Sequence, residues 1–495
     1  MPSYDIVVVG GGVSGMTSAL LLAAAGRSVA LVESFPRLAP TIRGFSRQGV
    51  HFDTGLHYVG GLGAGDPLRT YFSHLGILPS IIPVPYDPMG FDTFVFEESG
   101  KSYNIPAGRD SINNAFFQWF PEEQRAITEY FDSVGDVFNS SPFLNFALPF
   151  SMHSALHDNS CSLSDFLNRL TSNERLKVLL KYPCLLYGVA PEDALFSTHA
   201  LVAGSYYRSA HAVEGGGASV ANAFQSRLAS LGVDILCGNA VRDIVISGDG
   251  AFSGVTLEND HKIAADQCIW AAHPKSMLQA APSGALRGPF RQRIEALEET
   301  QSALMLFGLS DGQPVGLERR NLILWPGGDF RNKLAGEATM AENVVFLFAG
   351  QGGKMTKAPV TAMTPANSSR FMPWHGSKTG KRPSEYAQGK NQALDEFKVS
   401  LKQRCPKVAD NLQFIEGATP LTIRDYCQAP GGGLYGVRHS INQFNPQPLT
   451  RIRGLLMCGQ SIVAPGILGA VVSAYLACGF ILGHESLHQQ LQEVA

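Results

Sequence analysis

Four residues near the N-terminus have the types and spacing of a phosphate-binding turn. Gly10, Gly12 and Gly15 follow the pattern G-x-G-x-x-G, and Glu33 comes about 20 residues later. In such a turn the first glycine permits a tight bend, the second lets a pyrophosphate approach the backbone, and the third allows close helix–strand packing. The carboxylate accepts hydrogen bonds from the hydroxyls of a ribose. These residues predict a site for FAD or NAD rather than NADP, and do not separate the first two.

The segments around these residues form a strand–helix–strand unit. Residues 6–9 are apolar and β-branched, as in a buried strand, and an apolar run rich in Ala and Leu follows the glycines, as in a helix. A second short strand ends at Glu33. The free N–H groups at the helix start hold phosphate charge. The complete order favours a dinucleotide site over a glycine-rich turn without a ligand.

Two further segments are predicted to border the same site. Residues 49–55 alternate apolar and polar residues and close on a glycine, as in a strand that delivers a loop beside a cofactor. Residues 454–460 predict a strand followed by a glycine turn, and residues 465–470 open an apolar helix. The N–H groups at the start of that helix would stabilise negative charge on a bound ring system.

These motifs resemble a known family. Residues 49–61 (GVHFDTGLHYVGG) and 459–470 (GQSIVAPGILGA) are similar to segments of the phytoene desaturase, carotenoid isomerase and retinol saturase group of FAD-dependent oxidoreductases. Residues 52–61 and the motif between Thr419 and His439 resemble the retinol saturase branch in particular. The similarity in order and spacing covers nearly the whole chain, including residues 381–386.

The resemblance implies FAD as the cofactor and assigns its contacts by position. By position, the backbone of Val241 would contact the adenine, and the ADP half would be bound by Gly10, Gly12, Gly15 and Glu33. Gly459 and Gln460 would bind the ribityl and phosphate groups, and Ile467 and Leu468 would lie near the pyrimidine side of the flavin.

The chain departs from the family after the ribose-binding acid. The family usually carries a glycine pair there, often followed by arginine, whereas this chain has Ala39-Pro40-Thr41. This implies a reshaped loop beside the FAD phosphates, where Arg37 or Arg43 would supply the missing charge.

Hydride transfer to or from a flavin needs geometry and, for alkenes, a proton donor or acceptor. The candidates are histidines and tyrosines in motifs expected to border the flavin, and each is also consistent with a packing role. They are His57, Tyr58, Tyr426, Tyr435 and His439.

The expected function is that of an FAD-dependent enzyme acting on carbon–carbon bonds of an apolar, polyunsaturated substrate such as a carotenoid or retinoid. The low charged fraction of 16%, the apolar residues 142–150 and the resemblance support it, and saturation is favoured. Desaturation or cis–trans isomerisation, reduction or cyclisation of a polyene natural product, and amine oxidation are the enzymatic alternatives. An FAD-bearing sensor or structural protein is the non-enzymatic one.

The composition of the chain indicates which partners and which cellular compartment to expect. The net charge of −3 gives no reason to expect nucleic acid. Eight scattered cysteines without a C-x-x-C pair, and thirteen histidines without ligand spacing, predict neither a metal site nor disulfides and favour a reducing, cytoplasmic compartment. The first strand begins so near Met1 that we expect no cleaved signal peptide. The electron donor stays open among a quinone, a carrier protein and NAD(P)H.

Two segments raise the question of whether the protein spans or contacts a membrane. Residues 462–482 are 21 uncharged residues, enough to span a bilayer, but Pro465 and Gly466 near their start favour a buried helix. Residues 351–409 hold eleven Lys and Arg against three Asp and Glu. This basic segment predicts either a solvated face or a peripheral contact with a membrane or a donor protein.

The predicted fold is α/β: a Rossmann-like FAD-binding domain assembled from discontinuous segments, with an inserted α+β substrate domain. Strand-like segments at 234–237, 240–246, 253–257 and 263–272 return the chain to the first sheet. We expect the FAD-binding domain at 1–75, 205–290 and 415–495, and the substrate domain at 76–204 and 291–414.

Overall fold

The computed structural model describes residues 3–152, 161–351 and 356–495. The start of the chain folds as predicted: β1 (Ser3–Val9), α1 (Val13–Ala24) and β2 (Val29–Glu33) follow in order. β1 and β2 are parallel, with Ile6 opposite Val29. Their side chains are buried on both faces of the sheet, as is typical of parallel strands.

The first sheet collects strands from the start, middle and end of the chain. Among the described residues it has seven strands in the order β10-β2-β1-β13-β12-β11, with β19 beside β13. β13 lies parallel to β1 and β19 and antiparallel to β12. The later strands are β10 (Asp234–Cys237), β11 (Val241–Ile246), β12 (Phe252–Leu257), β13 (Lys262–Trp270) and β19 (Leu455–Met457). The predicted discontinuous assembly is confirmed.

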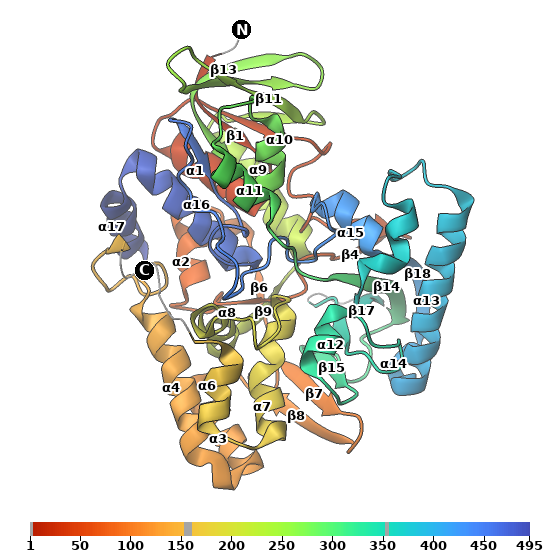
Figure 1. Cartoon of the computed structure of the whole chain (residues 1–495). Coiled ribbons are helices and arrows are strands. Elements are labelled where there is room, and N and C mark those ends of the chain that lie inside the picture. The colour runs from red at the N-terminus through yellow and green to blue at the C-terminus, as the bar shows by residue number, and fades with distance from the viewer. Residues whose placement is uncertain (1–2, 153–160, 352–355) are drawn as a thin grey trace.

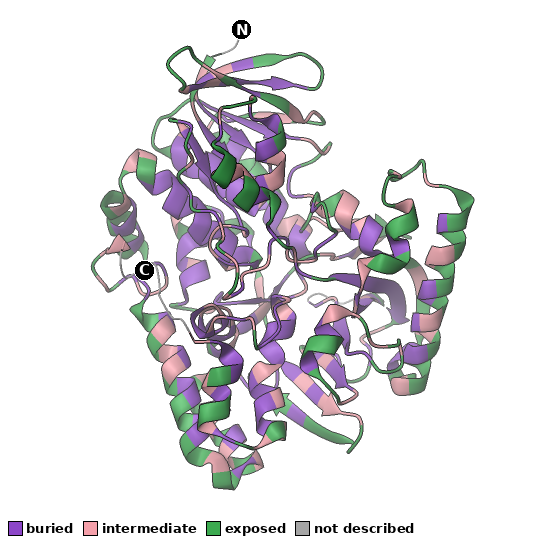
Figure 2. Cartoon of the chain, viewed as in Figure 1, coloured by how far each residue is buried: buried purple, intermediate pink, exposed green. Residues whose placement is uncertain are grey.

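Helices from distant parts of the chain cover this sheet (Figure 1). α16 (Gly466–Leu482) packs against α1, and Figure 2 shows both largely buried. α16 is apolar on every side, as expected of a helix enclosed by protein. Within the described residues, no helix combines the length and apolarity that crossing a membrane requires. The other helices near this sheet are α2 (Pro67–His74), α9 (Gly216–Ser230), α10 (Pro274–Ala280), α11 (Gly288–Glu295) and α17 (His484–Val494).

A second, mainly antiparallel sheet forms the other half of the molecule. Its seven described strands run in the order β18-β14-β17-β16-β15-β7-β8. They are β7 (Asp92–Phe96), β8 (Lys101–Ile105), β14 (Ser302–Asp311), β15 (Asn321–Trp325), β16 (Val345–Ala349), β17 (Lys357–Ala366) and β18 (Leu412–Ala418). Both faces of β14 and β16 are buried, so the sheet carries a hydrophobic cluster on each side.

One face of the second sheet is covered by η4 (Ser368–Trp374), α13 (Ser384–Arg404), α14 (Pro406–Ala409) and α15 (Pro420–Cys427), and α12 (Phe330–Ala335) packs on the opposite face. A helical layer drawn in orange and yellow in Figure 1 lies at the end of β7 and β8. It contains α3 (Arg109–Trp119), η2 (Pro121–Glu123), α4 (Gln124–Ser140), α6 (Leu163–Leu170), α7 (Glu174–Lys181), η3 (Tyr182–Leu186) and α8 (Phe196–Arg208).

Short strands and one short helix join the two halves. They are the hairpin β3 (Phe45–Arg47) and β4 (Val50–Phe52), the three-stranded sheet of β5 (Val59–Gly60), β9 (Ala210–Val213) and β6 (Pro83–Pro85), and η1 (Leu78–Ser80). The β3–β4 hairpin packs on β17, so the loop after β4 is held between the two large sheets.

The structure differs from the sequence-based expectations in two places, the domain boundary at residue 415 and the apolar segment 142–150. β18 crosses the predicted boundary at residue 415, because it pairs with β14 in the second sheet. In the apolar segment 142–150, Phe143 and Phe146 pack into the core of the first half, where Phe146 meets Tyr71 edge-on. These two aromatic residues therefore stabilise the fold and do not line the cavity described below.

Candidate active site

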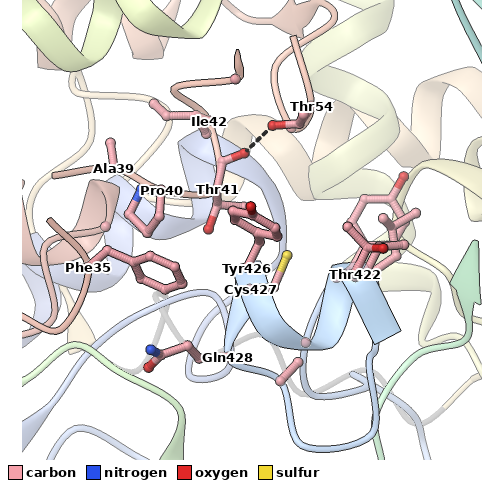
Figure 3. A pocket seen from close by; sticks show the side chains of 18 of the residues that line it. Phe35, Ala39, Pro40, Thr41, Ile42, Thr54, Thr422, Tyr426, Cys427 and Gln428 are labelled. Atoms are coloured by element: carbon pink, nitrogen blue, oxygen red, sulfur yellow. Dashed lines mark hydrogen bonds between the residues drawn. The ribbon is translucent and has the colours of Figure 1, made fainter. Parts of the chain in front are cut away.

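A cavity of about 930 Å³ is lined by residues of both halves of the molecule. One part of its wall is the predicted dinucleotide site, from Glu33 past Gly10 and Gly12 to Gly459. Another part is formed by the second sheet and by the loop after β4. Figure 3 shows a portion of this wall, where the loop after β2 faces the end of α15.

The glycine turn has the geometry that a pyrophosphate requires. Gly10 has a φ of +105°, and a Cβ built on Gly15 would lie 1.8 Å from the carbonyl oxygen of Gly10. Gly15 therefore does not line the cavity but allows α1 to approach β1. A Cβ on Gly12 would meet no atom within 4 Å, so this position opens onto the cavity. No side chain caps α1 and no acid stands in its first turn, which leaves the helix start for an anion.

Glu33 is held in the position expected of a ribose ligand. Its side chain is buried, and the N–H groups of Gly11 and Phe35 donate to its two oxygens at 2.6 and 2.8 Å. A carboxylate with two fixed donors cannot rotate freely, so its remaining acceptor sites face the cavity that it lines. Val241, at the start of β11, lines the same cavity.

The C-terminal motifs reach the cavity at the start of α16. Gly459, Gln460 and Ile467 line it, and the N–H of Gly459 donates to Ser473 Oγ at 2.9 Å. No side chain caps α16 and its first turn has no acid, so a second helix start points its partial positive charge at the site. Leu468 is not among the lining residues and packs into the core beside Gly61.

The loop that departs from the family pattern keeps a glycine-like backbone. Ala39 has a φ of +57° although it is not glycine, and its N–H donates to Gly11 O at 2.8 Å. Arg43 does not line the cavity: its guanidinium donates to Leu38 O, Asn222 and Gln225. Arg43 thus fastens the loop to α9 and is not placed to neutralise a phosphate.

Residues 215–217 are a further run of three glycines, at the start of α9, and their contacts are made within the chain. The N–H of Gly217 donates to Asp53 Oδ1 at 2.8 Å, and a Cβ on Gly216 would collide with the same carboxylate. The start of α9 therefore binds the chain's own carboxylate and anchors the loop that leads to His57.

The structure brings His57 and Tyr58 to the cavity wall. The His57 ring stacks on Phe348, with 4.3 Å between ring centroids, and burial lowers the pKa of His57 to about 4. A neutral imidazole in apolar surroundings is a poor proton donor at pH 7. Tyr58 is buried and its Oη donates to Asp92 Oδ2 at 3.0 Å.

The other three candidates lie in different settings. Tyr435 lines the cavity and its Oη donates to Leu185 O at 3.4 Å, a long hydrogen bond. Tyr426 is 48% exposed and its ring stacks on Phe35 at 6.0 Å, beside the ADP end of the cavity (Figure 3). His439 is not a lining residue. Its Nε2 donates to Gln460 O at 2.7 Å, so it supports the Gln460 turn.

Sequence analysis missed the apolar wall on the second sheet. This wall is formed by Met305, Phe307, Phe348, Met363 and Ile423. Met305 and Phe307 alternate on one face of β14, a period-two signal present in the sequence, but a strand buried on both faces does not show which face meets a ligand. Asp92, which binds Tyr58 from behind, was also missed.

Comparisons with known proteins show which family the chain belongs to. The family model for flavin containing amine oxidoreductase matches residues 13–304. All-trans-retinol 13,14-reductase of Danio rerio is 27% identical, over 99% of this chain and 88% of its own length. Hydroxyneurosporene desaturase of Rubrivivax gelatinosus is 25% identical, over 97% of this chain and 94% of its own.

The fold has solved counterparts. Putrescine oxidase with bound putrescine superposes with a TM-score of 0.66 at 14% identity, over 97% of this chain and 99% of its own. That likeness shows the fold alone, whereas the family model covers more than half of the 495 residues. The family model identifies the cofactor as FAD, and the glycine turn after β1, buried Glu33 and the two uncapped helix starts agree with that cofactor. The chain belongs to the flavin-containing amine oxidoreductase family and is an FAD-dependent oxidoreductase.

Proposed function

We propose that the protein saturates a carbon–carbon double bond of an apolar, polyunsaturated substrate. The observation that carries this proposal is the apolar wall of the second sheet, which faces the same cavity as the FAD cradle. The likeness to a retinol reductase and to a carotenoid-type desaturase along almost the whole chain supports the same substrate class.

FAD, when bound and reduced, supplies a hydride. The residues of the chain hold it and shape the space beside it. The turn at Gly10 and Gly12 and the carboxylate of Glu33 would hold the ADP half, and the start of α16 would hold the flavin end. Aromatic and thioether side chains on β14, β16 and β17 exclude water from that end and bind hydrocarbon by burying it.

The chemistry of the wall favours a polyene over an amine. A carboxylate is one partner that a cationic amine can pair with, and the described carboxylates that line the cavity are Glu33 and Glu416. Glu33 is held by backbone donors at the ribose position, and Glu416 pairs with Lys390 at 3.0 Å. Neither is available to bind an ammonium group beside the flavin.

Anaerobic stopped-flow spectroscopy tests the proposal. The FAD-loaded protein is photoreduced and mixed with all-trans-retinol or a carotenoid. We expect the flavin to be reoxidised by the polyene, and we expect putrescine not to reduce the oxidised flavin. Reduction of the flavin by amines, with no reoxidation by polyenes, would establish the amine-oxidase alternative instead.

In the basic segment 351–409, half of the described cations are paired within the chain. Five of its ten described Lys and Arg residues pair with carboxylates: Arg370, Arg382, Lys390, Lys398 and Arg404. A cytoplasmic location, a peripheral membrane contact and the identity of the electron donor stay predictions.

A further inference from the structure

Asp92 is a buried carboxyl group immediately behind the cavity wall. It begins β7, its side chain is fully buried, and no Lys or Arg among the described residues forms an ion pair with it. Asn321 Nδ2 donates to its Oδ1 at 2.7 Å and Tyr58 Oη to its Oδ2 at 3.0 Å. A buried carboxylate without a cation is costly, so its presence beside a reaction cavity requires a reason.

Tyr58 stands between this carboxyl group and the cavity. Its ring packs against Tyr206 at 5.0 Å and Phe348 at 6.1 Å, and all three residues line the cavity. Asp92 itself does not line the cavity. Tyr58 both lines the cavity and donates to Asp92, so it is the residue that links this carboxyl group to the cavity.

The phenol has a single O–H, and this makes the protonation state of Asp92 decisive. When Asp92 is ionised, Tyr58 donates its hydrogen to Oδ2 and has none for a ligand. When Asp92 is protonated, its own O–H can donate to Tyr58 Oη, which frees the phenolic hydrogen to face the cavity. Burial raises the pKa of Asp92 to about 6, although the hydrogen bonds from Asn321 and Tyr58 act to lower it.

We propose that Asp92 and Tyr58 form the proton-donating pair of the reaction, with Tyr58 as the catalytic acid and Asp92 as the residue that positions and reprotonates it. This inference rests on the proposed alkene reduction. In that reduction one alkene carbon receives a hydride, which FAD would supply when bound and reduced. As the second C–H bond forms, the Tyr58 O–H bond breaks, and the proton of Asp92 moves to the phenolate oxygen. Asp92 then regains a proton from solvent.

The other titratable groups around the pair do not change charge in the same range. Tyr86, Tyr182 and Tyr206 face it from the segment before β7, from η3 and from α8, and burial raises the pKa of each tyrosine. His57 lies on the neighbouring position of the same loop, with its pKa lowered by burial to about 4. Asp53 acts on His57 and Tyr86 from the loop after β4.

The pH profile of polyene reduction tests the pair. In the wild-type holoenzyme, kcat is expected to fall as pH rises through about 6, because the protonated form of Asp92 is the active one. Asp92→Asn should abolish this limb, and Tyr58→Phe should lower kcat about 100-fold with little change in KM. The matched control is Tyr86→Phe, which removes a hydroxyl bonded to Asn321 in the same cluster, and should keep the wild-type profile. An unchanged limb in Asp92→Asn, or an unchanged kcat in Tyr58→Phe, would overturn the pair.

Infrared titration of the holoenzyme without substrate gives a readout that does not depend on turnover. We expect a protonated-carboxyl band that disappears as pH rises through about 6 and is missing in Asp92→Asn. Tyr58→Phe removes a donor that lowers the pKa, so the midpoint should move to higher pH. No titration, or no movement of the midpoint, refutes the coupling even if polyenes are reduced. A wild-type enzyme that converts no polyene refutes the proposed function separately.

Discussion

Glu33 and Asp92 are buried and His57 is partly buried, and the surroundings of each side chain decide what it can do. Backbone N–H groups hold the Glu33 carboxylate at the ribose position. His57 lies against Phe348, and burial lowers its pKa to about 4, so it is neutral at pH 7. Burial raises the pKa of Asp92 to about 6, so below about pH 6 it holds a transferable proton within reach of Tyr58. Residue type alone would have ranked His57 first as an acid.

Glu33→Ala should weaken FAD binding without unfolding the protein. The change removes an ionised acceptor from the ribose and from the N–H of Gly11, and hydrogen bonds to charged groups contribute about 1.5–3 kcal/mol. The expected rise in Kd is about 10- to 100-fold, measured by the flavin fluorescence that remains on titration of apoprotein. Glu129→Ala, on an exposed face of α4, is the control and should bind FAD as the wild type does. An unchanged Kd for Glu33→Ala would remove Glu33 from the cofactor site.

At the scale of elements, the cofactor site depends on close approaches between backbones. α1 starts where β1 ends, and Gly15 lets the helix approach the Gly10 carbonyl. The same occurs at α16, where a Cβ on Gly469 would lie 2.2 Å from Ala464 O. These contacts fix both uncapped helix starts relative to the cavity. Small residues at these positions are therefore part of the binding geometry.

Gly15→Ala should destabilise the protein by about 3 kcal/mol and reduce FAD content, because the new methyl group would overlap the Gly10 carbonyl. Urea unfolding and flavin absorbance measure the two effects. Gly135→Ala in α4 makes the same substitution where a Cβ meets nothing within 4 Å, and should stabilise the protein by about 1 kcal/mol. Equal effects of the two changes would contradict the close-packing account.

At the scale of the whole molecule, the cavity exists because two sheets from interleaved segments meet. Residues 6–33, 454–460 and 465–470 predicted the cofactor half, because glycine turns and apolar helices have strong local signals. The substrate wall has no such signal. Met305 and Met363 reach the cavity through pairing of β14 with β17, and Asp92 meets Tyr58 only because β7 joins that sheet. The pairing of strands that lie far apart in the sequence cannot be predicted from the local pattern of residues in each strand.

Buried histidines in both halves make the stability of the molecule depend on pH. Burial lowers the pKa of His57 to about 4 and that of His199 to about 3, below the unfolded value of about 6.5. The unfolded chain therefore binds more protons as pH falls below about 6.5. Each histidine then removes up to about 1.4 kcal/mol of stability per pH unit, while Asp92, with its raised pKa, offsets part of this below about pH 6.

Urea unfolding of the holoenzyme should accordingly give a lower free energy of unfolding at pH 5 than at pH 7. In Asp92→Asn the loss on acidification should be steeper, since the offsetting carboxyl group is gone. Equal stability at the two pH values would show that His57 and His199 are not held neutral by burial.

The central claim is that the FAD-bound protein saturates a polyene, and mass spectrometry of a single anaerobic turnover tests it most directly. Photoreduced holoenzyme is mixed with one equivalent of all-trans-retinol in deuterated water. The account predicts a product with one double bond fewer that carries deuterium on both former alkene carbons, because the N–H of a reduced flavin exchanges with the solvent. Recovery of unchanged retinol from protein whose flavin stays reduced would contradict it.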